Sequence, residues 1–252
     1  EDTETAALLQ KKGDAHERAY LAEFKSAGTD VAMIETKLAG LDDQRAMTIA
    51  AMKAGKPVIF QAALFGDGWG GYADFLRRVE RPSKLGASSY EVEDTKLKRK
   101  EAPSHVLQLA LYSDLVAEIQ GVLPEHIHVK LGTGKLATLR LADYMHYARH
   151  LRRRLEAFIA GPEPTRPEPC SACSLCRWRE HCKTEWDETD SLVLVAGIRK
   201  DQRLKLETAG VATLGQLAQC KTPVPDLKAD THAKLREQAA LQHKRRQGGP
   251  PA

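Results

Sequence analysis

The sequence predicts an α/β protein, because strand-length apolar runs alternate with segments of helical periodicity over its first 160 residues. Glycine-rich turns such as "GDGWGG" and "LGTGK" separate the strand-length runs. The composition changes at 161–169, "GPEPTRPEP", where four prolines indicate a stiff boundary. We therefore expect an α/β core at 1–160, a proline linker with a four-cysteine segment at 161–190, and a small helical module with a basic tail at 191–252.

The elements of the core follow from periodicity and from turn residues. Helices are expected at 5–26 and 41–55, followed by strands in "KPVIFQAALF", "YADFLRRV" and "SYEVEDTKL". A helix from about 103 to 120 is expected to bury Leu107, Leu111, Leu115 and Ile119. A hairpin turning at Gly132 to Gly134 and a helix at 141–160 complete the core. The last helix is expected to bury Leu141, Met145, Ala148, Leu151, Leu155 and Phe158.

Composition restricts the class of protein. With 42% hydrophobic and 29% charged residues in 252, the chain is predicted to be globular. No run approaches the roughly 20 apolar residues of a membrane helix, and the opening "EDTETAALLQKKGD" is too polar for a signal peptide, so we expect a cytoplasmic protein. The net charge of +4 does not by itself indicate a nucleic-acid partner, although basic residues cluster at 96–100, 149–154 and 243–247.

Two predicted strands carry carboxylates where buried strands favour apolar residues. Because strand side chains alternate between faces, Asp94 and Lys96 share one face of "SYEVEDTKL", and a hairpin partner could bring Asp74 alongside. Two close carboxylates repel each other unless a cation lies between them, and oxygen ligands suit Mg²⁺ or Mn²⁺. A nearby lysine could orient water or stabilise charge on a phosphate. The combination suits phosphodiester hydrolysis.

Two helices carry polar residues that could complete this site. His105, Gln108 and Tyr112 share a face of the helix that follows the Asp94 strand. In the first helix, His16 could supply a nitrogen ligand to the same metal. Each motif alone also has a structural interpretation, in which Asp74 caps a hairpin and Asp94 pairs with Lys96 at an exposed edge. Their joint occurrence favours the metal site.

The segments "GDAHE", "VIFQAALFGDGWGGYADFL", "YEVEDTKLKR" and "HVLQLALY", in this order, resemble the RecB-like nucleases of the PD-(D/E)XK superfamily. The resemblance is to modules fused to superfamily 1 helicases and covers nearly the whole chain. It implies a restriction-endonuclease-like core with a mixed sheet flanked by helices. It further implies a Mg²⁺- or Mn²⁺-dependent deoxyribonuclease acting in repair, recombination or defence, with single-stranded DNA and a helicase domain or subunit as partners.

The same resemblance assigns roles to particular residues. It implies that the metal is bound by His16, Asp74, Asp94 and the carbonyl of Thr95. It implies that Lys96 assists catalysis by Asp74 and Asp94. Gln108 and Tyr112 would then line the path of the DNA.

Four of the five cysteines lie in "CSACSLCRWREHC", at Cys170, Cys173, Cys176 and Cys182. In a cytosolic chain this spacing indicates a metal or cluster site, and spacing alone does not distinguish zinc from an iron–sulfur cluster. The related AddB-type nucleases imply a structural [4Fe-4S] cluster, with Cys173, Cys176 and Cys182 as three of its ligands. The fourth ligand is then Cys170 or a residue outside this chain.

Two other functions are compatible with these residues. One is a DNA-binding clamp that serves a helicase without cutting, although such a protein has no use for the two carboxylates. The other is an interaction domain stabilised by zinc. The segment "GIRKDQRLKLETAGVATLGQLA" is expected to form two short helices in a module like a helix-hairpin-helix, although a small helical packing module explains it equally well.

Overall fold

A computed structural model describes residues 2–34, 40–161 and 165–248. The chain divides into two units, residues 3–163 and 164–252, and each is described by itself. The sequence predictions at residues 162–164 of the linker and 249–252 of the tail lie outside the described residues. None of the helices in the described ranges has the length and hydrophobicity of a membrane-spanning segment.

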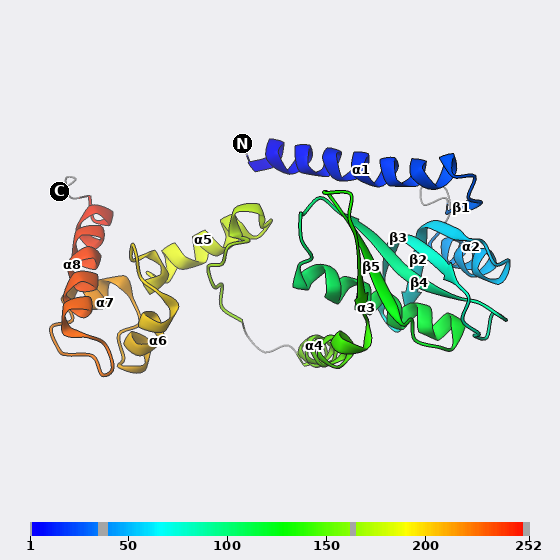
Figure 1. Cartoon of the computed structure of the whole chain (residues 1–252). Helices are drawn as coiled ribbons and strands as arrows, with labels where there is room; N and C mark the ends of the chain where they lie inside the picture. Colours follow the sequence, from blue (N-terminus) through cyan, green and yellow to red (C-terminus); the bar gives the residue numbers. More distant parts are fainter. Residues whose placement is uncertain (1, 35–39, 162–164, 249–252) are drawn as a thin grey trace. The chain divides into compact units, whose positions relative to one another are not determined.

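The first unit is built around a mixed six-stranded sheet whose strands lie side by side in chain order (Figure 1). β2 and β3 form an antiparallel hairpin, β3 and β4 are also antiparallel, and β5 and β6 form a second hairpin. β1 pairs parallel with β2, and β4 pairs parallel with β5, because helices α2 and α3 connect these strands. The strands are β1 (Val31–Met33), β2 (Val58–Gly66), β3 (Trp69–Val79), β4 (Ser89–Lys96), β5 (His126–Leu131) and β6 (Leu136–Arg140).

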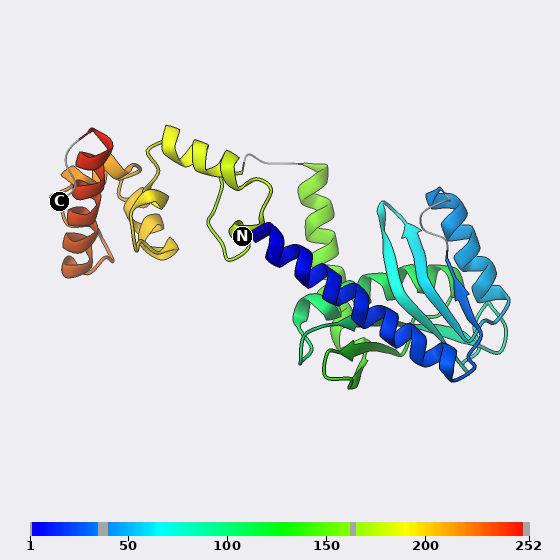
Figure 2. The same cartoon turned by 90° about the horizontal axis from the view of Figure 1, so that it is seen from above.

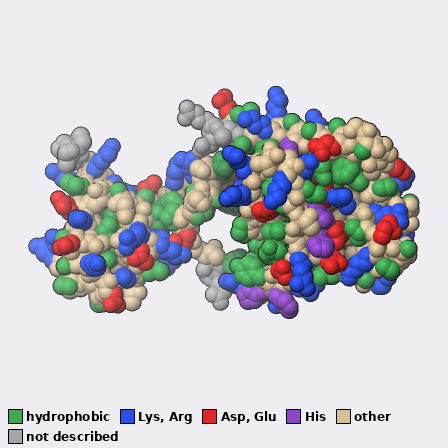
Figure 3. Space-filling view, viewed as in Figure 1, with side chains coloured by type: hydrophobic (Ala, Val, Ile, Leu, Met, Phe, Trp, Pro, Cys, Tyr) green, Lys and Arg blue, Asp and Glu red, His purple; other side chains and the backbone are tan. Residues whose placement is uncertain are grey.

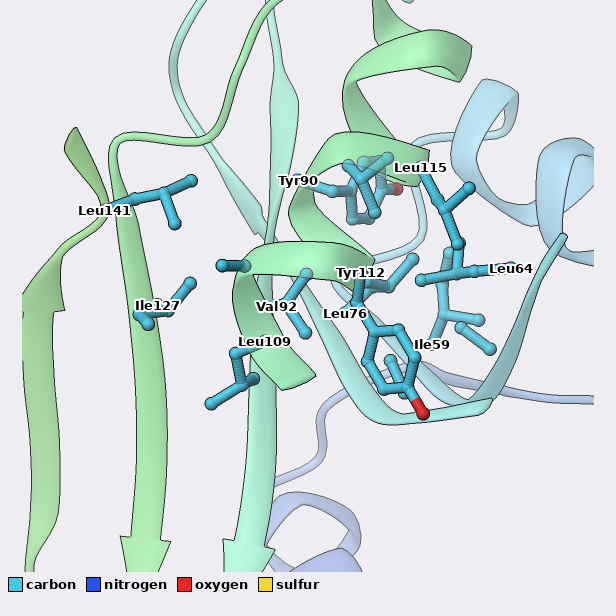
Figure 4. Packing of buried hydrophobic residues seen from close by; sticks show 14 of the residues in the cluster. Ile59, Leu64, Leu76, Tyr90, Val92, Leu109, Tyr112, Leu115, Ile127 and Leu141 are labelled. Carbon is cyan, nitrogen blue, oxygen red and sulfur yellow. The ribbon is translucent and has the colours of Figure 1, made fainter. Parts of the chain in front are cut away.

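Helices cover both faces of this sheet. α2 (Leu41–Lys53) and α3 (Pro103–Gln120) pack on one face, and Figure 4 shows Leu109 and Tyr112 of α3 among the strand residues Val92, Leu76 and Ile59. α1 (Asp2–Ser26) crosses the opposite face, as Figure 2 shows, where its aromatic side chains pack on Phe75. α4 (Ala142–Ala160) packs beside α3. The core is therefore an α/β arrangement with a mixed sheet between helices.

The ends of α3 agree with the sequence prediction. Pro103 is at the first helical position, where its missing N–H costs no hydrogen bond, and Gly121 ends the helix with a φ of 75°. The predicted buried stripe of α3 was wrong, since only Leu115 of its four residues is buried. A strict spacing of four residues turns about 40° per step around a helix, so it leaves the sheet-facing side. The buried residues that face the sheet include His105, Leu109, Tyr112 and Val116.

The predicted burial on α4 was right at the start of the helix and wrong towards its end. Met145 is the one buried residue of this helix, together with Leu141 immediately before it, whereas Leu155 and Phe158 are about half exposed. The sequence pattern is amphipathic, but in the described residues only the first turns of α4 meet the core of the first unit.

The second unit has a small core of its own. α6 (Lys200–Thr208), α7 (Leu214–Gln219) and α8 (Ala229–Arg246) enclose Leu192, Leu206, Leu214 and Leu217, all of which are buried. α6 and α7 are joined at "AGVAT", as the sequence predicts, and the capping box of Thr213 and Gln216 starts α7. The short helices η1 (Cys173–Leu175), α5 (Arg179–Glu188) and η2 (Leu192–Leu194) precede this core.

Candidate active site

The paired carboxylates lie where β3 and β4 separate. Their ladder ends at Phe75 and Glu93, so Asp74 and Asp94 come next on the two strands. Asp74 Oδ2 accepts hydrogen bonds from the backbone N–H of Thr95 at 2.8 Å and from its hydroxyl at 2.6 Å. These bonds hold the Asp74 carboxylate against the end of β4, beside Asp94.

Asp94 is more deeply buried than Asp74, with 2% of its surface exposed. Its Oδ2 lies 2.5 Å from Nζ of Lys96 and makes no other hydrogen bond within the described residues. Burial, and next the charge and hydrogen bond of Asp74, raise the pKa of Asp94 to about 8, although Lys96 opposes the shift. The two carboxylates therefore share a space that favours a proton or a cation between them.

A third carboxylate, absent from the sequence prediction, lies near the two aspartates. Burial and then the charge of Asp74 raise the pKa of Glu17 to about 6, so Glu17 on α1 lies within range of the charge of Asp74. Its Oε1 accepts a hydrogen bond from Nε2 of Gln61. In the sequence, the one signal for Glu17 is that it directly follows His16. Its approach to Asp74 depends on the placement of α1 across the sheet.

Gln61 is the second residue that sequence reasoning missed. It lies opposite Asp74, between the paired residues Phe60–Phe75 and Ala62–Ala73, and its φ is 55° although it is inside β2. Left-handed backbone is unfavourable for residues other than glycine, so the surrounding structure must hold this conformation. The residue with this left-handed backbone is the one whose side chain donates the hydrogen bond to Glu17.

His16 lies near this site without touching the two aspartates. Its Nε2 is 3.2 Å from the carbonyl oxygen of Lys130, the residue of β5 that pairs with Thr95 of β4. α1 is held on β5 by two further contacts of Lys130, an ion pair with Glu23 and the ring of Tyr20. The structure thus brings together Asp74, Asp94, Thr95 and Lys96, and it places His16 one strand away.

Gln108 and Tyr112 extend the site along α3. Gln108 is half-buried, and its Nε2 donates to the hydroxyl of Tyr112 at 3.2 Å. Tyr112 is buried against β3, where Gly71 makes room for it, because a Cβ there would lie 2.4 Å from the Tyr112 hydroxyl. Gln108 is therefore the more accessible of the two to a ligand.

The oxygen atoms of this site suit a hard cation that takes only some of its ligands from the protein. As they stand, no three His, Cys, Asp or Glu side chains in the described ranges are gathered closely enough to hold a metal ion. Mg²⁺ is usually held by one or two carboxylates and keeps water or substrate phosphate as its other ligands. Asp74 and the buried oxygen of Asp94 match that requirement, and the backbone carbonyl of Thr95 could add a further oxygen.

The charged surface includes both paired and unpaired cations. On the face drawn in Figure 3, Lys and Arg side chains lie among acidic ones over both units. Arg149 pairs with Asp114, and Arg152 pairs with Glu156, so the predicted basic cluster at 149–154 is partly neutralised. The exposed residues 98–100, which follow Lys96, form no ion pair within the described part of the chain. This loop carries free positive charge next to the carboxylates.

Two of the four clustered cysteines of the second unit are in contact with each other. Sγ of Cys170 lies 3.8 Å from Sγ of Cys173, and the backbone N–H of Cys170 donates to Cys173 Sγ at 3.2 Å. Burial, and then the nearby Cys176 and Cys173, raise the pKa of the Cys182 thiol. None of the described residues from 165 to 191 is buried. The described part of this segment therefore has no hydrophobic core.

No protein-family model matches this chain, and no curated protein matches it significantly. The geometry of the carboxylates and cysteines is accordingly the basis for assigning a function.

The raised pKa values predict how pH affects the metal-free protein. A carboxyl whose pKa is higher in the folded state than in the unfolded state loses stability as pH rises from its unfolded to its folded pKa. For Asp94 this window runs from about 4 to about 8. We expect Asp94→Asn to gain stability relative to wild type by about 1 kcal/mol per pH unit across that window.

Chemical denaturation of both proteins in chelator, from pH 5 to pH 8, measures this difference. Groups distant from Asp94 cancel in this difference, which therefore reports on Asp94 and the charges that interact with it. A constant difference over this range would show that Asp94 ionises normally.

Proposed function

We propose that this chain is a metal-dependent deoxyribonuclease of the RecB-like, PD-(D/E)XK kind. The observation that carries the proposal is the buried Asp94, held beside Asp74 and 2.5 Å from Lys96 at the separated ends of two strands. A purely structural site has no reason to bury the Asp94 carboxylate beside a second, half-buried one at a free-energy cost. The unpaired cations at 98–100 favour a polyanionic substrate such as DNA.

The protein residues have separate roles in phosphodiester hydrolysis. Asp74 and Asp94 would hold Mg²⁺ or Mn²⁺ through their carboxylate oxygens, with the carbonyl of Thr95 and the more distant His16 as further candidate ligands. When bound, the cation supplies positive charge that activates water and offsets charge on the phosphate. Thr95 keeps the Asp74 carboxylate oriented through its two hydrogen bonds. Lys96 stabilises the negative charge that develops on the phosphate oxygens.

Lys96 and the metal ligands have separable effects. In Lys96→Met, we expect kcat for DNA cleavage to fall by about 100- to 1,000-fold, the usual effect of losing one group that stabilises transition-state charge. Binding of Mn²⁺ should persist but require higher pH, because Lys96 opposes the raised pKa of Asp94. Single-turnover cleavage and Mn²⁺ titrations measure the two quantities.

Lys56→Met is the matched control, since Lys56 also pairs with an aspartate, Asp30, at 2.8 Å on the first unit. It should leave cleavage unchanged. If Lys96→Met cleaves at the wild-type rate, Lys96 has no catalytic role.

The cysteine segment would bind a structural cofactor, and the resemblance favours a [4Fe-4S] cluster. The contact between Cys170 and Cys173 favours a second candidate, zinc. A tetrahedral site with Zn–S bonds of about 2.3 Å places its sulfur atoms about 3.8 Å apart, and 3.8 Å is the separation between these two Sγ atoms. Absorption at about 400 nm with bound iron identifies the cluster, and a colourless protein with one equivalent of zinc identifies the alternative.

A further inference from the structure

A buried histidine at the start of α3 has no role in the site described above. His105 is 7% exposed, and its Nδ1 has no hydrogen-bond partner within the described residues. A buried polar atom without a partner carries a desolvation cost, so such atoms in folded proteins are usually satisfied by water, an ion or a ligand. His105 therefore marks a place where a polar group is missing.

The orientation of α3 directs this side chain toward the active site. His105 lies one turn before Leu109, which packs in the same core as Val92 of β4 (Figure 4). Asp94 and Lys96 follow Val92 on the same face of that strand. Helical side chains lean toward the N-terminus of their helix. The imidazole thus points from the buried face of α3 toward the end of β4 that carries Lys96.

The start of α3 is suited to an anion. No side chain caps this 18-residue helix, and its first turn contains no acidic residue. The N–H of His105 bonds to the carbonyl of Ala102 at 2.9 Å, whereas the N–H of Ser104 lies in the first turn, where no intrahelical acceptor exists. The helix dipole adds positive potential there.

The charge around His105 is positive as well. Burial first, and then the charges of Lys96 and Lys98, lower the pKa of His105. The ring is therefore neutral at neutral pH and keeps one N–H that can be donated. The two charges that shift this pKa, those of Lys96 and Lys98, are both positive.

We propose that the start of α3 binds a phosphodiester group of the DNA next to the one that is cleaved. Nδ1 of His105 and the N–H of Ser104 donate to its oxygens, and Lys98 supplies charge. This inference rests on the proposed nuclease function and adds a substrate-positioning site to it. Because the contacts are made to phosphate, the site holds the strand in register without reading its bases.

The test measures binding in the Asp94→Asn background, so it does not depend on cleavage. A fluorescent single-stranded DNA carries one uncharged methylphosphonate, which is moved along the strand. We expect one position at which the methylphosphonate weakens binding about tenfold, the typical effect of losing a hydrogen bond to a charged group. His105→Phe should weaken binding of unmodified DNA about tenfold and lose sensitivity at that position. His105→Asn keeps an N–H donor, so it should retain part of the DNA affinity and part of the sensitivity to the methylphosphonate.

His232→Phe is the matched control. His232 of α8 is also 7% exposed, and its Nε2 has no partner within the described residues. This substitution should leave the methylphosphonate pattern unchanged. Thermal unfolding checks that each variant is folded. The methylphosphonate scan of the protein that keeps His105 gives a result even if His105→Phe does not fold.

Three results would overturn the inference. These are a flat methylphosphonate scan, an unchanged pattern in folded His105→Phe, and the absence of DNA binding. If inorganic phosphate shifts the His105 ring resonances while the scan stays flat, the site takes free phosphate and the DNA assignment is wrong. A positive scan in a protein that never cleaves DNA would contradict the nuclease function and leave the phosphate site intact.

Discussion

Asp94→Asn is expected to reduce DNA cleavage by on the order of 1,000-fold or more, while changing DNA affinity in chelator by less than about twofold. The substitution keeps the size of the side chain and removes the charge that a divalent cation requires. Affinity in chelator depends on basic groups such as those at 98–100, which the substitution does not alter. Cleavage of labelled DNA and fluorescence anisotropy measure the two effects.

Glu93→Gln provides the control for this prediction. Glu93 is the preceding residue on β4, is fully buried, and pairs with Arg77 at 3.0 Å on the opposite face of the sheet. Its substitution should lower stability because it weakens the ion pair of this buried carboxylate with the partly exposed Arg77, without changing the metal requirement of cleavage. The site assignment would be wrong if Asp94→Asn cut DNA normally, or if it lost DNA binding without losing the rate of cleavage of bound DNA.

Cys176→Ser is expected to cause the largest loss of structure. None of the described residues from 165 to 191 is buried, so this segment has no core of its own once the proposed cofactor is lost. We expect the variant to lose the iron or zinc of the wild type and to become at least about tenfold more susceptible to protease within this segment. Metal analysis, absorption at about 400 nm and limited proteolysis with mass mapping provide the readouts.

Cys220→Ser is the control, because Cys220 packs against the core of the second unit, away from the cysteine cluster in sequence, and its thiol donates to the carbonyl of Thr222. It should retain the metal and the wild-type cleavage pattern. A Cys176→Ser protein with the metal content and protease resistance of wild type would contradict a structural cofactor.

Much of the fold of the first unit could be predicted from local sequence signals. Pro103 and Gly121 define α3, and the glycine turns define both hairpins of the sheet. Burial on the helices was predicted less well, because it depends on which side of a helix meets the sheet. On α4, an amphipathic pattern predicted burial of Leu155 and Phe158, which remain about half exposed.

The candidate site was predictable where its residues are close in sequence. Alternation along one strand places Asp94 and Lys96 together, and the adjacent strand supplies Asp74. Glu17 and Gln61 were missed because their contact joins α1 to β2 across 44 residues. It also requires a left-handed backbone at Gln61, which no sequence pattern here predicts.

Cleavage of DNA by the unmodified protein tests the central claim most directly. Labelled single-stranded and duplex DNA would be incubated with the protein in Mg²⁺, in Mn²⁺ and in excess chelator. We predict shortened products with either cation and none in chelator, because Asp74 and Asp94 repel each other and need a cation between them to act. Intact DNA under all three conditions, with the DNA bound by a folded protein, would contradict the nuclease and leave a DNA-binding clamp.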